Sequence, residues 1–239
     1  MAEIRGNPSS LTLRSGRKLL YATNRLVEIS LAENGYSVNV LQNSSDLESG
    51  KYEGGLKIWE GGIDLCNFIE DPTFFKKHIV GKRILELGCG AALPSITALV
   101  NGASEAVVND FNDFVLRCFT SQNFRLNNIP ESKWKSIPGT WSSLCESDLS
   151  PKSYDLILTS ETIYNEQYYA SLHDVMDKFL ADDGIILLAA KVYYFGLGTS
   201  IDDFEKYLNE KSVFKATEVW RSSDSSVPRK ILQLSRTKS

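Results

Sequence analysis

The sequence predicts an α/β fold built on a seven-stranded sheet that is parallel except for an antiparallel hairpin at its C-terminal end. Short apolar runs alternate with stretches of helical periodicity over residues 83–208, which is typical of a parallel sheet covered on both faces. The last two β-like runs, 213–221 and 229–235, are separated only by a turn, so they must pair antiparallel. The first apolar run also leads into a glycine-containing loop at 86–92, a position where open α/β sheets bind ligands.

The individual strands and helices follow from the periodicity of the apolar residues. Apolar runs predict buried strands at 83–87, 106–109, 154–159 and 185–190, and residues 134–137 are a further candidate strand. Apolar residues at helical spacing predict helices at 59–69, 93–100, 111–126, 168–180 and 201–208. Asn101-Gly102 and Asn127-Asn128 are expected to end the second and third of these helices.

The first 51 residues follow a different pattern and predict a short β-rich extension. Residues 1–16 are polar, and we expect a mobile tip there. Between residues 18 and 42, two β-favouring runs flank Asn34-Gly35, a dipeptide typical of hairpin turns. Residues 43–51 predict a polar loop. We therefore expect an N-terminal extension over residues 1–51 and a ligand-binding α/β domain over residues 52–239.

Composition excludes several classes of protein. Lys and Arg number 26 against 30 Asp and Glu, a net charge of -4, which argues against direct binding of a nucleic-acid backbone. The four cysteines form no CxxC pair and the two histidines stand alone, so we expect no metal site. We find no apolar run of about 18 residues and no signal-peptide core. The expectation is a cytoplasmic or nuclear protein without a membrane contact.

The candidate cofactor loop begins with Glu86 and contains Gly88, Cys89 and Gly90 between a strand and a helix. Glycines are needed where the backbone turns sharply and a ligand approaches it closely. An acid beside the loop would repel a pyrophosphate, but it complements the ammonium and the sulfonium of S-adenosylmethionine. A nicotinamide fingerprint would place a third glycine at Leu93, so an oxidoreductase is disfavoured.

Asp110 strengthens this interpretation because it lies 20 residues beyond Gly90, at the end of the next predicted strand. An acid at that position can accept both hydroxyls of an adenosine ribose, although it could also cap a helix. Further candidate cofactor-binding residues lie before the first core helix, beside Asp110 and after the later strands. They are Trp59, Phe111, Asn112, Trp141 and Ser160.

A polar loop follows the buried strand at 154–159 and carries the candidate catalytic residues Glu161, Tyr164 and Asn165. This loop is expected at the carboxyl edge of the sheet, where open α/β folds bind their ligands. A glutamate and a tyrosine three residues apart at that edge are candidates for orienting an acceptor.

Four segments together resemble the histidine protein methyltransferase family: YEGGLKIWE at 52–60, ILELGCG at 84–90, VVNDFN at 107–112 and LTSETIYN at 158–165. The resemblance implies the class I, Rossmann-like methyltransferase fold over residues 52–239. It also implies methyl transfer from S-adenosylmethionine to a ring nitrogen of a histidine in a large-subunit ribosomal protein. By position, Glu86, Gly88 and Gly90 match the cofactor loop of the family, and Asp110 matches its ribose acid.

The resemblance further assigns Glu161 and Tyr164 to the D/E-x-x-Y element that follows the fourth strand in this group. Ala92 departs from the family pattern, in which many relatives carry a third glycine. A neutral imidazole already attacks as a nucleophile near pH 7, so the enzyme has mainly to align it. A carboxylate on the other ring nitrogen would stabilise the positive charge that develops, and Glu161 is the candidate for it.

Two other functions are compatible with these residues. A methyltransferase of the same fold could act on lysine or on a small molecule, and a nucleoside-binding module could serve in assembly without catalysis.

We expect a monomer that binds a protein substrate.

Overall fold

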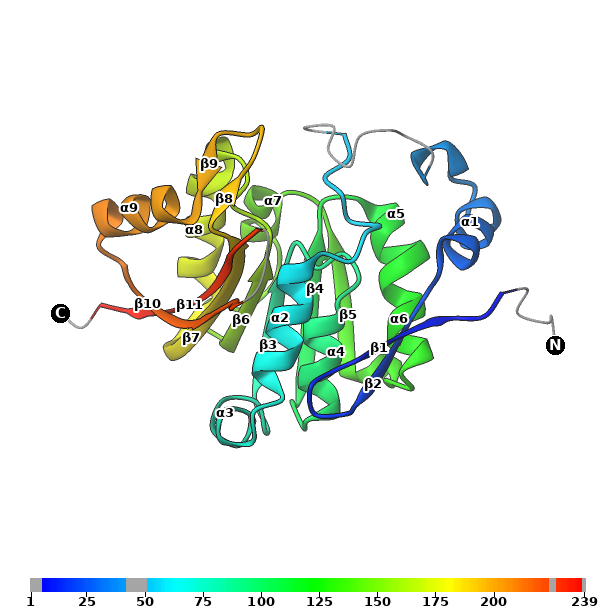
Figure 1. The fold of residues 1–239 in the computed structure, drawn as a ribbon, viewed down its shortest axis with the longest axis horizontal. Helices are drawn as coiled ribbons and strands as arrows, with labels where there is room; N and C mark the ends of the chain where they lie inside the picture. Colours follow the sequence, from blue (N-terminus) through cyan, green and yellow to red (C-terminus); the bar gives the residue numbers. More distant parts are fainter. Residues whose placement is uncertain (1–5, 42–50, 224–226, 238–239) are drawn as a thin grey trace.

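The computed structural model describes residues 6–41, 51–223 and 227–237, and it contains the predicted seven-stranded sheet. The strand order is β10-β11-β7-β6-β3-β4-β5 (Figure 1). The five parallel strands are β3 (Arg83–Leu87), β4 (Glu105–Asp110), β5 (Trp134–Pro138), β6 (Tyr154–Ser160) and β7 (Leu180–Lys191). The hairpin of β10 (Phe214–Arg221) and β11 (Arg229–Arg236) pairs antiparallel to β7. The predicted sheet is therefore confirmed.

Helices cover both faces of the sheet. One face carries α2 (Glu60–Ile69), α4 (Leu93–Val100) and a continuous helical segment. This segment consists of α5 (Asp113–Val115), a π-turn (Leu116–Thr120) and α6 (Ser121–Leu126). The other face carries α7 (Trp141–Cys145), α8 (Tyr169–Phe179) and α9 (Ile201–Lys211). The predicted helices are confirmed to within a few residues, while α3 (Pro72–His78) and α7 were not predicted.

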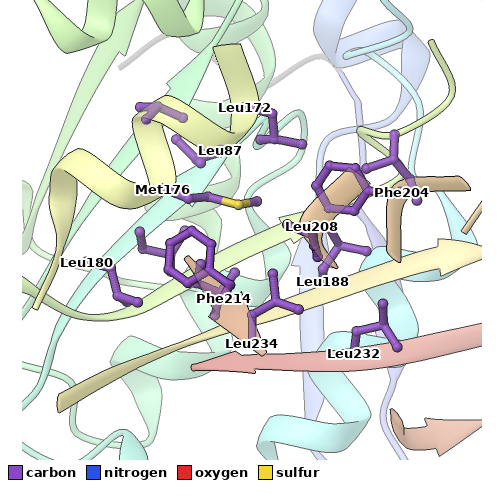
Figure 2. Packing of buried hydrophobic residues seen from close by; sticks show 14 of the residues in the cluster. Leu87, Leu172, Met176, Leu180, Leu188, Phe204, Leu208, Phe214, Leu232 and Leu234 are labelled. Atoms are coloured by element: carbon purple, nitrogen blue, oxygen red, sulfur yellow. The ribbon is translucent and has the colours of Figure 1, made fainter. Parts of the chain in front are cut away.

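Side chains alternate between the two faces along each strand, which is what a doubly covered sheet requires. In β3, Leu85 and Leu87 face α8 and α9, whereas Ile84 packs in the cluster beneath α2. Figure 2 shows the first of these clusters, where Phe204 and Phe214 close over leucines from β7 and β11. The core thereby fixes the strand register on which the site depends.

The predicted hairpin around Asn34-Gly35 is wrong, because residues 24–33 form a helix. The chain forms β1 (Ser9–Thr12), β2 (Lys18–Tyr21), α1 (Asn24–Glu33) and a 3-10 turn (Val38–Leu41). Gly35 has a φ of 76°, and the amide of Tyr36 donates to the Leu31 carbonyl at 2.9 Å. The Asn-Gly pair therefore ends a helix instead of turning a hairpin. The predicted polar loop lies almost wholly outside the described residues, as do residues 1–5 of the predicted mobile tip.

Two asparagines hold this N-terminal segment: the buried Asn123 of α6, which also bonds the cofactor loop, and Asn127 at the C-terminal end of that helix. The Ala22 amide donates to Oδ1 of Asn123 at 2.8 Å, and Nδ2 of Asn123 donates to the Ala91 carbonyl at 2.9 Å. Asn127 similarly accepts from the Leu20 amide at 3.0 Å and donates back to its carbonyl at 2.7 Å. Residues 9–33 thus pack directly against the helices that flank the site.

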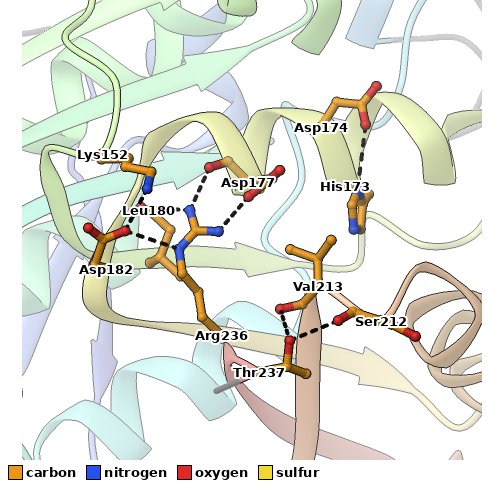
Figure 3. Close-up of polar contacts among 10 residues, drawn as sticks. All are labelled: Lys152, His173, Asp174, Asp177, Leu180, Asp182, Ser212, Val213, Arg236 and Thr237. Atoms are coloured by element: carbon orange, nitrogen blue, oxygen red, sulfur yellow. Dashed lines mark hydrogen bonds and ion pairs between the residues drawn. The ribbon is translucent and has the colours of Figure 1, made fainter. Parts of the chain in front are cut away.

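The end of β11 is fastened to the C-terminus of α8 by Arg236 (Figure 3). Its guanidinium donates to the carbonyl oxygens of Asp177 and Leu180 at 2.6 and 2.9 Å and pairs with the Asp177 carboxylate. A cation that binds the last carbonyls of a helix also complements the helix dipole. Among the helices of the described residues, none is long and apolar enough to cross a membrane.

Candidate active site

A cavity opens at the carboxyl edge of the parallel strands, the upper edge in Figure 1. Its walls come from the stretch before α2, the loop after β3, the ends of β4 and β5, and the loop after β6. All but two of the site residues predicted from sequence line it: Trp59, Glu86, Gly88, Cys89, Gly90, Asp110, Phe111, Trp141, Ser160, Glu161 and Tyr164. The structure thus brings together residues that are as far apart as 105 positions in the chain (59 to 164).

The glycine loop adopts a backbone that only glycine tolerates readily. Gly88 and Gly90 have φ values of 63° and 46°, in the left-handed region. A Cβ at Gly88 would lie 2.7 Å from Cγ2 of Thr162, and a Cβ at Gly90 would lie 3.0 Å from the Gly55 carbonyl oxygen. The loop therefore forms a cradle of bare backbone in the cavity wall, and a side chain at either glycine would collide with Thr162 or with the Gly55 carbonyl.

Asp110, at the end of β4, holds this loop in place. One carboxylate oxygen accepts from the Gly90 amide at 2.9 Å and the other from the Asn112 amide at 3.3 Å. Burial raises the pKa of Asp110 to about 6, so it is mostly ionised at pH 7. A carboxylate offers about four lone pairs, and the remaining ones can accept ribose hydroxyls.

Glu86 sits at the end of β3 and is almost completely buried. Its Oε2 accepts from the Ser95 amide at 2.9 Å, in the first turn of α4. Burial raises the pKa of Glu86 to about 8. At pH 7 the carboxyl is therefore protonated to a greater extent than an ordinary glutamate, and a cation that enters the cavity favours its ionised form.

This gives an expected proton linkage. A bound cation favours the ionised form of Glu86 and lowers its pKa, so cofactor binding at pH 7 should release up to about one proton. Affinity should accordingly rise from pH 6 to pH 8. Calorimetric titrations in two buffers of different ionisation enthalpy measure this release. The Glu86→Gln variant should release fewer protons than the wild type when the cofactor binds, because the proton of Glu86 is absent. Identical proton release in the two proteins would contradict the expectation.

Aromatic rings close the two ends of the cavity. The Trp59 indole donates to the Gly54 carbonyl at 3.0 Å, which fixes the stretch before α2. Lys191 lies over the same indole, with Nζ 5.0 Å from the ring centroid. Trp141 meets Tyr168 edge-on at 6.3 Å between ring centroids. Flat apolar faces of this kind are suited to an adenine ring and to the methylene groups of a cofactor.

Glu161 follows β6 in a left-handed conformation, with a φ of 56°. Its amide donates to the Ala189 carbonyl at 2.9 Å, which anchors this turn to β7. Oε2 accepts from the Tyr194 hydroxyl at 2.7 Å, whereas Oε1 is buried against Gly61 in the first turn of α2. Burial raises the pKa of Glu161. The carboxylate is therefore held between the end of β6 and α2, in the wall of the cavity.

Tyr164 is joined across the cavity to the stretch before α2. Its hydroxyl donates to Oε2 of Glu53, and the Tyr168 hydroxyl donates to Oε1 of the same residue at 3.2 Å. Burial and the Glu53 carboxylate both raise the pKa of Tyr164, so it stays a phenol. Glu53 thus fixes two rings of the cavity wall. This role is not predicted from the sequence, although Glu53 lies in the YEGG segment that resembles the family.

Asn112 and Asn165 are not brought to the cavity. Nδ2 of Asn112 donates to the Lys51 carbonyl at 2.9 Å, and Oδ1 of Asn165 accepts from the Gln167 amide at 3.0 Å in a short 3-10 turn (Glu166–Tyr168). Thr162 and Tyr194 were also missed. Tyr194 carried no sequence signal, because its contact with Glu161 spans 33 residues.

The cavity residues fit S-adenosylmethionine. The glycine cradle leaves room for a ligand against the backbone, and Asp110 has free acceptor capacity for a ribose. Glu86 can accept a cationic or N–H group. These features would hold the cofactor with its adenosine near Asp110 and its charged end near Glu86.

Comparison with known proteins gives a consistent result. A family model described as lysine methyltransferase matches residues 42–201. The histidine protein methyltransferase 1 homolog of Rattus norvegicus is 38% identical over 217 residues, which cover 78% of this chain and 59% of the relative. The homolog of Dictyostelium discoideum is 38% identical over 176 residues, covering 72% of this chain and 55% of the relative. The chain therefore spans somewhat more than half the length of these relatives.

A solved structure supports the fold. The ribosomal protein L11 methylase from Lactobacillus delbrueckii subsp. bulgaricus has a TM-score of 0.56 at 17% identity, covering 81% of this chain and 92% of that chain. The family model spans more than half of the 239 residues. The resemblance to the histidine protein methyltransferases is confirmed, and the chain belongs to the methyltransferase family that this model describes.

Proposed function

We propose that this protein is a protein-histidine N-methyltransferase that uses S-adenosylmethionine and modifies a histidine of a large-subunit ribosomal protein. The observation that carries the histidine assignment is Glu161. Its carboxylate is buried in the cavity wall, and one of its oxygens is held by the Tyr194 hydroxyl. A carboxylate fixed in this way is suited to accept the ring N–H of an acceptor imidazole.

The charge of the cavity favours an imidazole over an amine. Glu53, Glu86, Asp110 and Glu161 all line it, with Lys57 as the basic residue among the lining side chains. Carboxylates stabilise a lysine ammonium, whose ordinary pKa is about 10.4 and which attacks only after losing a proton. The same carboxylates also raise the pKa of an imidazole, but from an ordinary value of about 6.5, so the neutral ring with its nucleophilic lone pair is far more accessible near pH 7 than a neutral amine.

Each residue has a defined task in this reaction. S-adenosylmethionine, when bound, supplies a methyl group on a sulfonium for in-line displacement by the ring nitrogen. Glu161 accepts the hydrogen bond of the other ring nitrogen, which fixes the tautomer and stabilises the positive charge that the ring acquires. Tyr164, held by Glu53, forms a wall that aligns the ring, and the site works mainly by positioning.

A second candidate is a protein-lysine methyltransferase, since the matching family model is described by that activity. The same cavity could align an amine if the lysine reached it uncharged. The ribosomal acceptor is proposed on the sequence resemblance, and a cytoplasmic or nuclear location on the composition of the chain. A non-catalytic nucleoside-binding module is the remaining alternative.

The test is transfer of a labelled methyl group to protein extracted from large ribosomal subunits. We expect one protein to be labelled, by a single methyl group on a histidine located by peptide mapping. The single-turnover rate should rise from acidic pH and level off, because both the acceptor imidazole and Glu161 must be deprotonated; burial raises the pKa of Glu161 and shifts this rise upward.

Replacing the acceptor histidine by glutamine should remove all labelling, since an amide nitrogen is a poor nucleophile. A methyl group mapped to lysine would replace the proposal by the second candidate. Cofactor binding without transfer to any protein would favour the non-catalytic module.

A further inference from the structure

Exposed apolar side chains gather on one hairpin beside the cavity. In the part of the chain that the structure describes, four large hydrophobic residues are strongly exposed: Val80 (51%), Tyr193 (43%), Phe195 (73%) and Leu197 (49%). Three of them fall within five consecutive residues. Exposed apolar groups that cluster in this way are commonly a binding surface, whereas single ones are normal.

The hairpin has a definite shape. β8 (Tyr193–Tyr194) pairs antiparallel with β9 (Thr199–Ser200), and a turn of Phe195 to Gly198 connects them. The Leu197 amide donates to the Tyr194 carbonyl at 3.1 Å, and the rings of Tyr193 and Phe195 meet at 5.1 Å between centroids. The apolar side chains are therefore presented as a preorganised cluster at the tip of an ordered turn.

The base of the hairpin is hydrogen-bonded directly to two residues that line the cavity, Glu161 and Tyr164. From β8, the buried Tyr194 donates its hydroxyl to Glu161 at 2.7 Å. From β9, the Thr199 hydroxyl donates to the Tyr164 carbonyl at 3.0 Å. In Figure 1, β8 and β9 rise from the same edge of the sheet that carries α7. The cluster is thus held at a fixed place on the rim, next to the proposed catalytic carboxylate.

The chemistry of the hairpin selects the kind of partner. Residues 192–200 read VYYFGLGTS and contain no charged side chain, in a chain of which 23% is Asp, Glu, Lys or Arg. A surface for phosphates of RNA or of lipid headgroups would require Lys or Arg. An apolar surface without charge instead gains free energy by excluding water against apolar side chains of a protein.

We propose that the hairpin at residues 193–200 is the docking surface for the protein acceptor and binds apolar residues that flank the modified histidine. This inference rests on the proposed function, because a side chain delivered into the cavity brings its neighbouring residues onto the rim. Since the hairpin is already ordered by Tyr194 and Thr199, docking requires little loss of conformational freedom. The rim thereby contributes to the choice of protein, while the cavity determines the choice of residue.

The test uses the double variant Phe195→Ser, Leu197→Ser and the control Val80→Ser. Val80 is similarly exposed, but it precedes β3 and so lies at the amino end of the strands, away from the cavity. Initial rates are measured against increasing concentrations of protein extracted from large ribosomal subunits. We expect the double variant to require an about tenfold higher concentration for half-maximal rate. Its maximal rate, cofactor affinity and thermal midpoint should match those of Val80→Ser.

Each result decides a separate point. Equal half-saturating concentrations for the wild type and the double variant would overturn the docking proposal and leave the proposed function intact. A wild type that labels no histidine in this extract would overturn the proposed function, and the docking proposal with it. Sedimentation equilibrium tests whether a second copy of this chain binds the hairpin instead. A wild type that is a dimer, with a double variant that is a monomer, would assign the hairpin to that second copy and overturn the proposal.

Discussion

Replacing Glu161 by glutamine is expected to lower the rate of methyl transfer by about a hundredfold to a thousandfold, the range seen when one preorganised electrostatic group is removed. Glutamine keeps the volume of the side chain against Gly61 and Tyr194 but loses the negative charge that faces the developing imidazolium. Glu161→Ala should cost at least as much. Cofactor affinity should change little in either variant, because Asp110 and the glycine cradle are unaffected.

The measurement is a single-turnover rate at saturating cofactor, beside a calorimetric titration of the cofactor. Glu166→Gln is the matched control, since Glu166 is exposed and lies in the same loop. Equal losses of rate and affinity would make Glu161 a cofactor ligand instead of a catalytic residue.

Replacing Asp110 by alanine is expected to weaken cofactor binding by about a hundredfold or more. Two hydrogen bonds from ribose hydroxyls to a charged acceptor contribute about 1.5–3 kcal/mol each, and 1.4 kcal/mol corresponds to a factor of ten. The variant also loses the bond that fixes the Gly90 amide. Gly88→Arg should abolish binding, because it combines a left-handed φ with a side chain that fills the cradle.

Titration calorimetry of S-adenosylmethionine checks these expectations. Asp113→Ala serves as the control, because the neighbouring carboxylate binds Arg117 and Tyr36 instead of lining the cavity. Circular dichroism should show that every variant is folded. Near wild-type affinity in both Asp110→Ala and Gly88→Arg would refute the placement of the cofactor.

The sequence was sufficient where local pattern and function coincide. The inner strands β3, β6 and β7 contain continuous apolar runs, since both of their faces are buried. The glycines of the cofactor loop are required by its left-handed backbone. Glu86, Asp110 and Glu161 stand at the ends of neighbouring strands, so topology alone brings them to one edge. Apolar runs, loop glycines and acidic residues at strand ends can all be identified from the sequence alone.

Contacts between distant segments were not predictable in the same way. The hydrogen bonds of Glu53 with Tyr164 and of Tyr194 with Glu161 depend on how loops fold back over the sheet. The error at Asn34-Gly35 has a similar cause, because the same dipeptide turns a hairpin or ends a helix according to what precedes it. Here Leu26, Val27 and Leu31 are buried on one side of α1, and tertiary packing overrides the β-favouring local sequence.

Asn123 of α6 and Asn127 at its C-terminal end also set an order of events during synthesis. The amides of Leu20 and Ala22 bind side chains that lie 107 and 101 residues further along the chain. A nascent chain emerges N-terminus first, so these strands leave the ribosome long before their partners exist. Every residue of the cofactor loop is also translated before Asn123, which bonds the Ala91 carbonyl of that loop. The N-terminal segment can therefore complete these native hydrogen bonds only after the first βαβ unit has been translated.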